Sequence, residues 1–516
     1  MPYPSPLRLF LLTLCLVAGA APAAINPPSR NVAWLAAASD ADVDRAFAQA
    51  RAQNKPVLLY WGATWCPPCN QLKATFFNRQ DFAQASRAFV AVHVDGDRPG
   101  AQKLGTRFKV SGYPTVVLFT PAGAEITRLP GEADPEAMMA VLQQGMAGGR
   151  PAKAVLADAR AGKPLAPAEW RLLAFYSWDT DEQQLVGKDE LPALLAQLAL
   201  AVPASEPDIA TRLWLKAVAE SDDGKGLKPD AALRERVLRV LADPVQTRLH
   251  ADVIANLAPE LVRALSDDDS AERAPLVTAA AAALRRLEQD GTLSRGDRIS
   301  ALIGRIQLAR LGQPKDAVKV DLPASLIAEV KAHVARDDRE ITDGYERQAV
   351  ITAAAYALGQ AGLWDESDAL LKANLAKSHS PYYLMSQLGG NARKRGQTDE
   401  ALKWYGEAFA KSEGPATRLQ WGSSYLVALV DLAPQDAARI EKTAATLIRE
   451  AAQDPGAFSG RSARALQRMG RKLAAWAAGG PQNAARQRLQ KQLDATCAKV
   501  EPAGREACRG LLRPAA

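Results

Sequence analysis

The sequence predicts two kinds of structure in one chain: an α/β sandwich with a central mixed sheet, and after it a larger all-α, solenoid-like region. Between residues 40 and 119, apolar β-prone runs alternate with helical patterns, and a turn at 121–123 leads into a returning strand. Parallel strands joined by helices and followed by an antiparallel hairpin define such a mixed sheet. After residue 150 the segments are helix-length and rich in alanine and leucine, and none is a convincing strand. Many short stacked helices are typical of an α-solenoid.

The start of the chain has the features of a secretory signal peptide. Arg8 precedes an apolar run at residues 9–20, and small residues follow it, which suits cleavage near Ala23 or Ala24. The run is shorter than the roughly 20 residues that span a bilayer. We therefore expect residues 1–24 to be removed and the mature chain to be periplasmic or otherwise exported, with no stable membrane span. The alternative is a permanent N-terminal anchor.

The composition describes an ordinary soluble surface. Lys and Arg number 64 against 57 Asp and Glu, a net charge of +7, and no basic tract is interleaved with aromatic residues. This pattern argues against nucleic acid as a partner. Signal cleavage would leave four of the five cysteines, namely Cys66, Cys69, Cys497 and Cys508. An even, sparse number of cysteines in an exported protein permits disulfides.

The α/β domain is expected to occupy residues 25–149. Its first helix, at 40–53, places Val43, Phe47 and Ala50 on one face. Further helices are expected at 66–78, 81–87, 102–108 and 135–147, and strands at 57–61, 89–95 and 125–129, with another that is entered through Pro114 and ends at Phe119.

Two cysteines, Cys66 and Cys69, stand at the junction between the strand at 57–61 and the following helix. Pro67 suits the first helical position, where a missing N–H costs nothing. The unpaired N–H groups and the positive end of the helix dipole favour a thiolate, so the pKa of Cys66 should fall. This is the arrangement expected of a nucleophilic, exchangeable cysteine.

The run from Trp65 to Cys69, the segment 112–115 before an apolar strand, and Gly123 in the hairpin together resemble the thioredoxin superfamily. The resemblance implies a thioredoxin fold, with Cys66 as the attacking thiol and Cys69 as the resolving thiol. It also implies a cis bond between Tyr113 and Pro114 beside the cysteines, with Trp65, Tyr113 and Pro114 contacting substrate. No cofactor and no metal are implied.

The sequence departs from thioredoxins proper at the group that handles the proton of the resolving cysteine. The buried carboxylate of the family is replaced by Tyr60, and its lysine partner by Ala91. His93 lies on the same strand face as Ala91 and is a candidate for this role; the alternative is a structural hydrogen bond at a strand end. The closer resemblance is to exported thioredoxin-like domains that relay reductant outside the cytoplasm.

Two other uses of the Cys66–Cys69 pair are less favourable. A zinc knuckle needs four ligands, and Cys497 and Cys508 lack the spacing of a second knuckle pair. A purely structural disulfide across so short a loop would stabilise the fold very little.

The helical part divides into an array at residues 150–345 and a second region at 346–516. In the second region Gly362 and Pro381 recur 34 positions later as Gly396 and Pro415, a period that resembles tetratricopeptide repeats. Such repeats present a groove for a peptide or a partner protein; the alternative is a scaffold or an oligomerisation surface. The aromatic residues Trp364, Trp404, Tyr405 and Trp421 are interpreted as helix-packing core.

Cys497 and Cys508 flank a predicted turn at 502–504 between two short helical stretches. A structural disulfide that fixes the C-terminus is the simpler interpretation. The alternative is a second redox pair that exchanges electrons with Cys66 and Cys69.

The leading hypothesis is an exported thiol–disulfide oxidoreductase acting on protein disulfides, with the helical region selecting or holding a protein partner. A membrane-embedded redox relay is the expected source of electrons for a reducing enzyme, and the direction of electron flow stays open. The alternative is a non-catalytic adaptor that binds through its helical repeats and uses the α/β domain for docking.

Overall fold

The computed structural model describes residues 31–513 except 132, 222–225 and 479–481. The predicted signal peptide lies outside the described residues. Within the described residues, no helix combines the length and the apolar character needed to cross a membrane.

The predicted mixed sheet forms the centre of the N-terminal part, and it has five strands, one more than expected. Its strands are β1 (Leu35–Ala37), β2 (Val57–Gly62), β3 (Val90–Asp95), β4 (Thr115–Phe119) and β5 (Glu125–Leu129), in the order β1-β3-β2-β4-β5. β1, β3 and β2 run parallel, while β4 is antiparallel to β2 and β5 to β4. The sequence did not indicate β1, because three residues at a sheet edge are too short to show an alternating pattern.

Helices cover both faces of the sheet. They are α1 (Asp40–Gln53), α2 (Pro67–Leu72), α3 (Gln80–Ala85), α4 (Ala101–Arg107) and α5 (Pro135–Met146). Alternate residues of β2 point to opposite faces. Leu58 and Tyr60 pack with residues of α2, α3 and α5, whereas Leu59 and Trp61 pack with residues of α1 and α4.

The helix predicted at 66–78 is not one regular helix. α2 ends at Leu72 and a π-helical turn, Lys73–Phe77, continues it. Both Phe76 and Phe77 are fully buried in the same cluster. An α-helix separates neighbouring side chains by about 100°, so the wider π turn accommodates two adjacent buried rings.

Helices make up the remainder, and the described residues after 150 contain no strand. They are α6 (Ala152–Arg160), α7 (Pro167–Ala174), α8 (Leu191–Ala201), α9 (Pro207–Ala219), α10 (Ala231–Ala242), α11 (Pro244–Leu249), α12 (Ala251–Leu265), α13 (Arg273–Gln289), α14 (Arg295–Ala309), α15 (Ala324–Glu340), α16 (Gly344–Gln360), α17 (Trp364–Asn374), α18 (Pro381–Lys394), α19 (Thr398–Lys411), α20 (Pro415–Leu432), α21 (Ala437–Ala451), α22 (Gly460–Trp476), α23 (Asn483–Cys497) and α24 (Pro502–Arg509).

Gly362 and Gly396 occupy the predicted turns, before α17 and α19, with φ of 74° and 72°. This left-handed backbone favours glycine, which explains their recurrence. The type of solenoid and the domain boundaries remain predictions.

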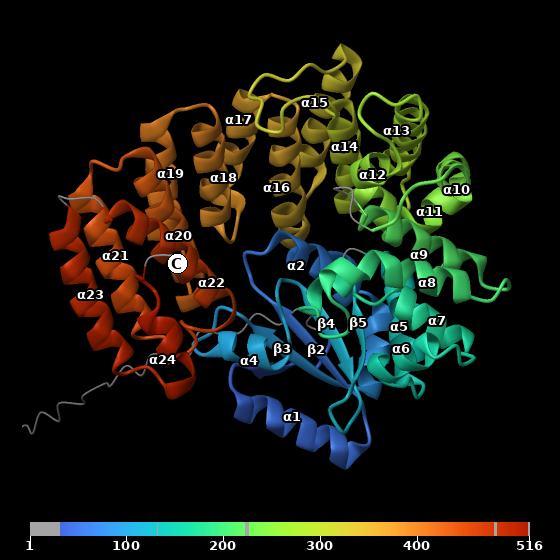
Figure 1. Cartoon of the computed structure of the whole chain (residues 1–516), viewed down its shortest axis with the longest axis horizontal. Helices are drawn as coiled ribbons and strands as arrows, with labels where there is room; N and C mark the ends of the chain where they lie inside the picture. The colour runs from blue at the N-terminus through green and yellow to red at the C-terminus, as the bar shows by residue number, and fades with distance from the viewer. Residues whose placement is uncertain (1–30, 132, 222–225, 479–481, 514–516) are drawn as a thin grey trace, which may run out of the picture.

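The helices curve around the sheet in an arc, so that the last of them return to the N-terminal part (Figure 1). α16 packs on α2, and α22 packs on α4. Polar contacts join the same two parts: the Gly100 N–H donates to Asp454 at 2.9 Å, and Arg464 donates to the Ser111 carbonyl at 2.8 Å. The helical region therefore covers the end of the sheet where β2 leads into α2.

Candidate active site

Cys66 is the N-cap of α2, directly after the loop that leaves β2. Its sulfur accepts the backbone N–H of Cys69 at 3.2 Å, which is the contact that would stabilise a thiolate. The buried amide of Asn70 holds the turn by donating to the carbonyls of Thr64 at 2.9 Å and Cys66 at 2.8 Å. Cys66 and Cys69 form a disulfide with their Cα atoms 5.2 Å apart.

Of the three residues expected to contact substrate, Trp65 and Tyr113 pack with the two cysteines, and Pro114 lines one cavity with Pro67 and Pro68. The Tyr113–Pro114 bond is cis, as the resemblance implied. The rings of Tyr113 and Trp65 lie 6.0 Å apart, edge to face. Gln102 donates to the Tyr113 hydroxyl at 2.6 Å and fixes its position.

The helical region encloses the site, which the sequence did not indicate. Trp65 stacks on Tyr383 of α18 at 5.9 Å and meets Trp421 of α20 edge to face at 5.8 Å. Its Nε1 donates to the Thr417 hydroxyl at 2.8 Å. As a result Trp65 is 5% exposed, Cys66 3% and Cys69 0%. The interpretation of Trp421 as packing between helices alone was incomplete, because it also packs on the cysteine motif.

A partly buried carboxylate continues this contact. The Thr417 hydroxyl donates to Asp97, which follows β3. A chain of hydrogen bonds therefore runs from Trp65 to Thr417 of α20 and from there back to Asp97 of the N-terminal domain. Burial, together with the nearby charge of Asp95, raises the pKa of Asp97 to about 7. Asp97 was missed in the sequence, where it belongs to an unremarkable polar loop.

Asp97 should make the free energy of unfolding decrease as the pH rises. A carboxyl with a raised folded-state pKa binds more protons when folded, so stability declines between the unfolded pKa of about 4 and the folded value. From about pH 5 to about pH 8 the decline is on the order of 2 kcal/mol, since one pKa unit is about 1.4 kcal/mol. When the free energy of unfolding is measured with urea at several pH values, Asp97→Asn should lack this decline. The same change at exposed Asp399 is the control, and an unchanged pH slope in Asp97→Asn would refute the assignment.

A second buried charge lies one helical turn after Cys69. Lys73 is buried under the Tyr345 ring of α16, with its Nζ 5.1 Å from the ring centroid. Burial lowers the pKa of Lys73 to about 8, partly offset by the charge of Asp95. Burial also raises the pKa of Asp95. Lys73 was also missed in the sequence. Its position four residues after Cys69, in the predicted helix at 66–78, could have indicated that it lies near the cysteine motif.

His93 stacks on Tyr60 in the core, with ring centroids 5.1 Å apart. Burial, with smaller contributions from the charges of Lys73 and Arg98, lowers the pKa of His93 to about 3. The imidazole is therefore neutral at ordinary pH. Its part in proton handling stays a prediction.

Cys497 and Cys508 form the second disulfide, with Cα atoms 5.6 Å apart. It joins α23 to α24 and is buried among residues such as Leu447 and Leu493, in a different cluster from Cys66. The four described cysteine sulfurs are thus used in two separate disulfide bonds.

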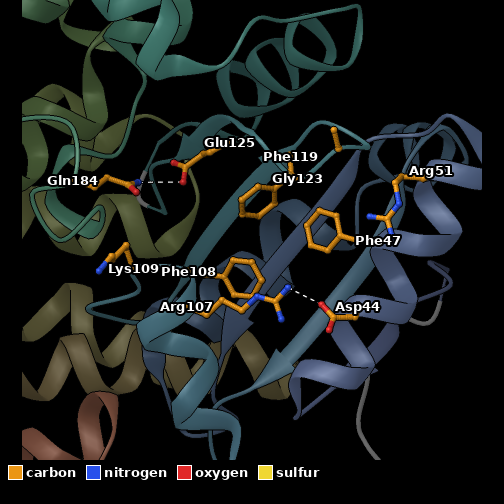
Figure 2. Close-up of a pocket in the computed structure, with 11 residues that line it drawn as sticks. Asp44, Phe47, Arg51, Arg107, Phe108, Lys109, Phe119, Gly123, Glu125 and Gln184 are labelled. Atoms are coloured by element: carbon orange, nitrogen blue, oxygen red, sulfur yellow. Dashed lines mark hydrogen bonds and ion pairs between the residues drawn. The ribbon is translucent and has the colours of Figure 1, made fainter. Parts of the chain in front are cut away.

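A cavity of about 530 Å³ lies on the side of the domain formed by α1, the end of α4 and the β4–β5 turn (Figure 2). Phe47, Phe108 and Phe119 form its apolar wall. Arg107 points along it and pairs with Asp44 at 2.7 Å. None of the predicted site residues lines this cavity, so it is distinct from the cysteine site.

Residues 43–146 match the family of thioredoxin-like domains. This part of the chain is therefore a thioredoxin-like domain with a Cys66–Cys69 pair, and a largely helical region follows it. The chain is 31% identical over 113 residues to thiol:disulfide interchange protein DsbD 1 of Pseudomonas aeruginosa, covering 21% of this chain and 19% of that protein. It is 32% identical over 120 residues to DsbD 2 of the same organism, covering 22% and 20%.

The chain spans about a fifth of the length of the curated relatives it matches. A solution structure of a thioredoxin from Thermus thermophilus is 28% identical, and the similarity covers 23% of this chain and 94% of that one, with a TM-score of 0.20. The thioredoxin-like domain, its cysteine pair and the two DsbD relatives support thiol–disulfide exchange as the chemistry of the site.

Proposed function

We propose that the chain is an exported thiol–disulfide oxidoreductase that acts on protein disulfides. The observation that carries this proposal is the Cys66–Cys69 disulfide at the start of α2; cis Pro114 lines one cavity with Pro67 and Pro68 of that helix. A sulfur that caps a helix receives the N–H groups and dipole that favour the thiolate, which is the reactive form.

The reaction follows from the two sulfurs. In the reduced protein the Cys66 thiolate attacks one sulfur of a substrate disulfide, and the other substrate sulfur leaves as a thiolate. Cys69 then loses its proton and attacks Cys66, which releases the second substrate thiolate and forms the Cys66–Cys69 disulfide. Two electrons pass to the substrate, and the reverse sequence oxidises a dithiol.

Lys73 is the group we assign to the proton of Cys69. It lies four residues after Cys69, at the start of the π-helical turn that continues α2, and its lowered pKa of about 8 lets it exchange a proton near neutral pH. His93, with its pKa of about 3, is less suited to receiving a proton there.

The proposal extends to partners and location. The relatives are named thiol:disulfide interchange proteins, which supports a redox relay as the donor of electrons to this chain. We place the chain in the periplasm or another exported compartment, with the helical region holding a protein partner. The buried Cys497–Cys508 bond is given a structural role, because it links two helices within a core.

A second candidate function is a non-catalytic adaptor. Its support is the burial of both active-site sulfurs beneath α18 and α20, since a covered disulfide is hard for a large substrate to reach. In that case the contacts of Trp65 with Tyr383 and Trp421 are a domain interface only.

The test is reduction of insulin by dithiothreitol with and without the mature protein. An oxidoreductase accelerates precipitation of the insulin chains well above the rate with dithiothreitol alone. An unaltered rate, with the protein folded and its Cys66–Cys69 bond reduced, would contradict the proposal and favour the adaptor.

A further inference from the structure

The end of the helical arc, from α18 to α24, covers the cysteine motif. Trp65 and Cys66 lie in one buried cluster with Tyr382 and Met385 of α18 and Trp421 of α20. In thiol–disulfide exchange the attacking sulfur must contact a substrate sulfur directly. Because Cys66 is 3% exposed, a protein substrate does not reach its sulfur while these helices stay in place.

The arc is attached to the N-terminal domain at two separated places. Near its middle α16 packs on α2, and close to its end α22 packs on α4. The last helices, drawn in orange and red, return to the domain beside α4 (Figure 1). Each helix of such an array contacts mainly its neighbours, so the array bends by small rotations between successive helices. The part from α18 onward therefore has a way to move off Cys66 without unfolding, while α16 stays on α2.

Polar contacts join the α4 segment to the end of the arc, and each of them is weak. The Gly100 N–H donates to Asp454, just before α22, at 2.9 Å. Lys103 of α4 forms an ion pair with Glu501, just before α24, at 2.7 Å, and both side chains are partly exposed. Exposed ion pairs and single hydrogen bonds contribute little, because water replaces them when the surfaces separate.

The closed arrangement also leaves polar atoms unsatisfied. Trp421 Nε1 and one carboxylate oxygen of Asp454 are buried with no hydrogen-bond partner in the described part of the chain. A buried polar atom without a partner costs free energy, and water recovers it once the atom is exposed. These two groups therefore favour opening, whereas the contacts of the Trp65 ring with Tyr383 and Trp421 oppose it.

We propose that α18 to α24 form a releasable cover that controls access to Cys66. The proposal rests on the proposed function, because it names the regulation of the same site. The arrangement described above is the closed state, in which protein disulfides do not reach the sulfur. A minor open state, in which Tyr383 and Trp421 have left Trp65, carries the exchange. The observed rate is then the rate of the open state multiplied by the fraction of molecules that are open.

The test measures access to Cys66 without any substrate disulfide. In the mature Cys69→Ser protein, Cys66 is a free thiol while Cys497 and Cys508 stay bonded to each other. Alkylation by iodoacetamide is followed above the pKa of the thiol, so that its rate reports access. Trp421→Ala, added to this background, should raise the rate by about 10-fold or more, because it removes a central aromatic contact of the cover.

A charge change remote from the sulfurs separates opening of the cover from a local effect of the missing ring. Lys103→Glu places an acidic side chain against Glu501 and should raise the alkylation rate by about 2- to 5-fold, although this pair joins α4 to the start of α24. Exchanging the two charges, with Lys103→Glu and Glu501→Lys together, should restore the rate of the Cys69→Ser background. The matched control is Lys153→Glu, the same change at an exposed position on α6, which should leave the rate unaltered.

An unaltered rate in Trp421→Ala or in Lys103→Glu would overturn the proposal, and so would a lack of rescue by the exchanged charges. The outcome is separable from that of the proposed function. Faster alkylation in these variants, without insulin reduction by the parent protein, refutes only the enzyme. Insulin reduction by the parent protein, with alkylation rates that the variants leave unaltered, refutes only the cover.

Discussion

Cys66→Ser is expected to lose essentially all protein-stimulated insulin reduction, a decrease of about 100-fold or more relative to the parent protein. A serine hydroxyl does not ionise near neutral pH and cannot form a mixed disulfide. The variant therefore has no thiolate at position 66 for the end of α2 to stabilise. The readout is the initial rate of insulin precipitation with dithiothreitol at equal protein concentrations.

The control for this change is a variant with both Cys497→Ser and Cys508→Ser. That disulfide lies in a separate core, so its removal should lower stability but leave the rate per folded molecule close to the parent value. Retention of turnover by Cys66→Ser would contradict the assignment of the attacking sulfur. Loss of turnover in the folded double variant would instead indicate that the second pair takes part in electron transfer.

Arg212→Met should destabilise the protein by about 3–5 kcal/mol, the usual cost of leaving a buried charge without its partner. Arg212 is 1% exposed and donates to both carboxylate oxygens of Asp252, at 2.9 and 2.6 Å, and to the Ala174 carbonyl at 3.1 Å. Burial alone would raise the pKa of Asp252, yet the pKa is lowered, because Arg212 more than compensates. Three helices, α7, α9 and α12, are tied together through this one side chain.

Urea unfolding at neutral pH measures this change. Arg239→Met is the control, because Arg239 pairs with Glu235 on an exposed helix face and such pairs contribute about 0.5 kcal/mol or less. If Arg212→Met were as stable as Arg239→Met, the Arg212–Asp252 pair would not hold these helices together.

The local features of the fold and site were predictable from the sequence. The strand-to-helix junction at Cys66 depends on residues close together in the chain, and the cis bond before Pro114 was implied by the resemblance to the thioredoxin superfamily. The continuous apolar run of β2 and the helical pattern at 40–53 are likewise local. This is why the thioredoxin-like domain could be placed from motifs alone.

The enclosure of the site could not be predicted. The Trp65–Thr417 hydrogen bond joins residues 352 positions apart, and Thr417 and Trp421 look like ordinary interior positions of a helix. Burial is the largest cause of the shifted pKa values of Asp97 and Lys73, and the tertiary contacts that bury them are not visible in the sequence. Tertiary contacts of this kind leave no periodic signal.

The central claim is that the end of α2 keeps the Cys66 sulfur ionised enough to exchange partners. The most direct measurement is the rate of alkylation of Cys66 in the reduced protein as a function of pH, with Cys69→Ser used to isolate the single thiol. The account predicts a midpoint well below the ordinary cysteine pKa of about 8.5. A midpoint at or above that value would show that burial outweighs the helix end, and would contradict the account.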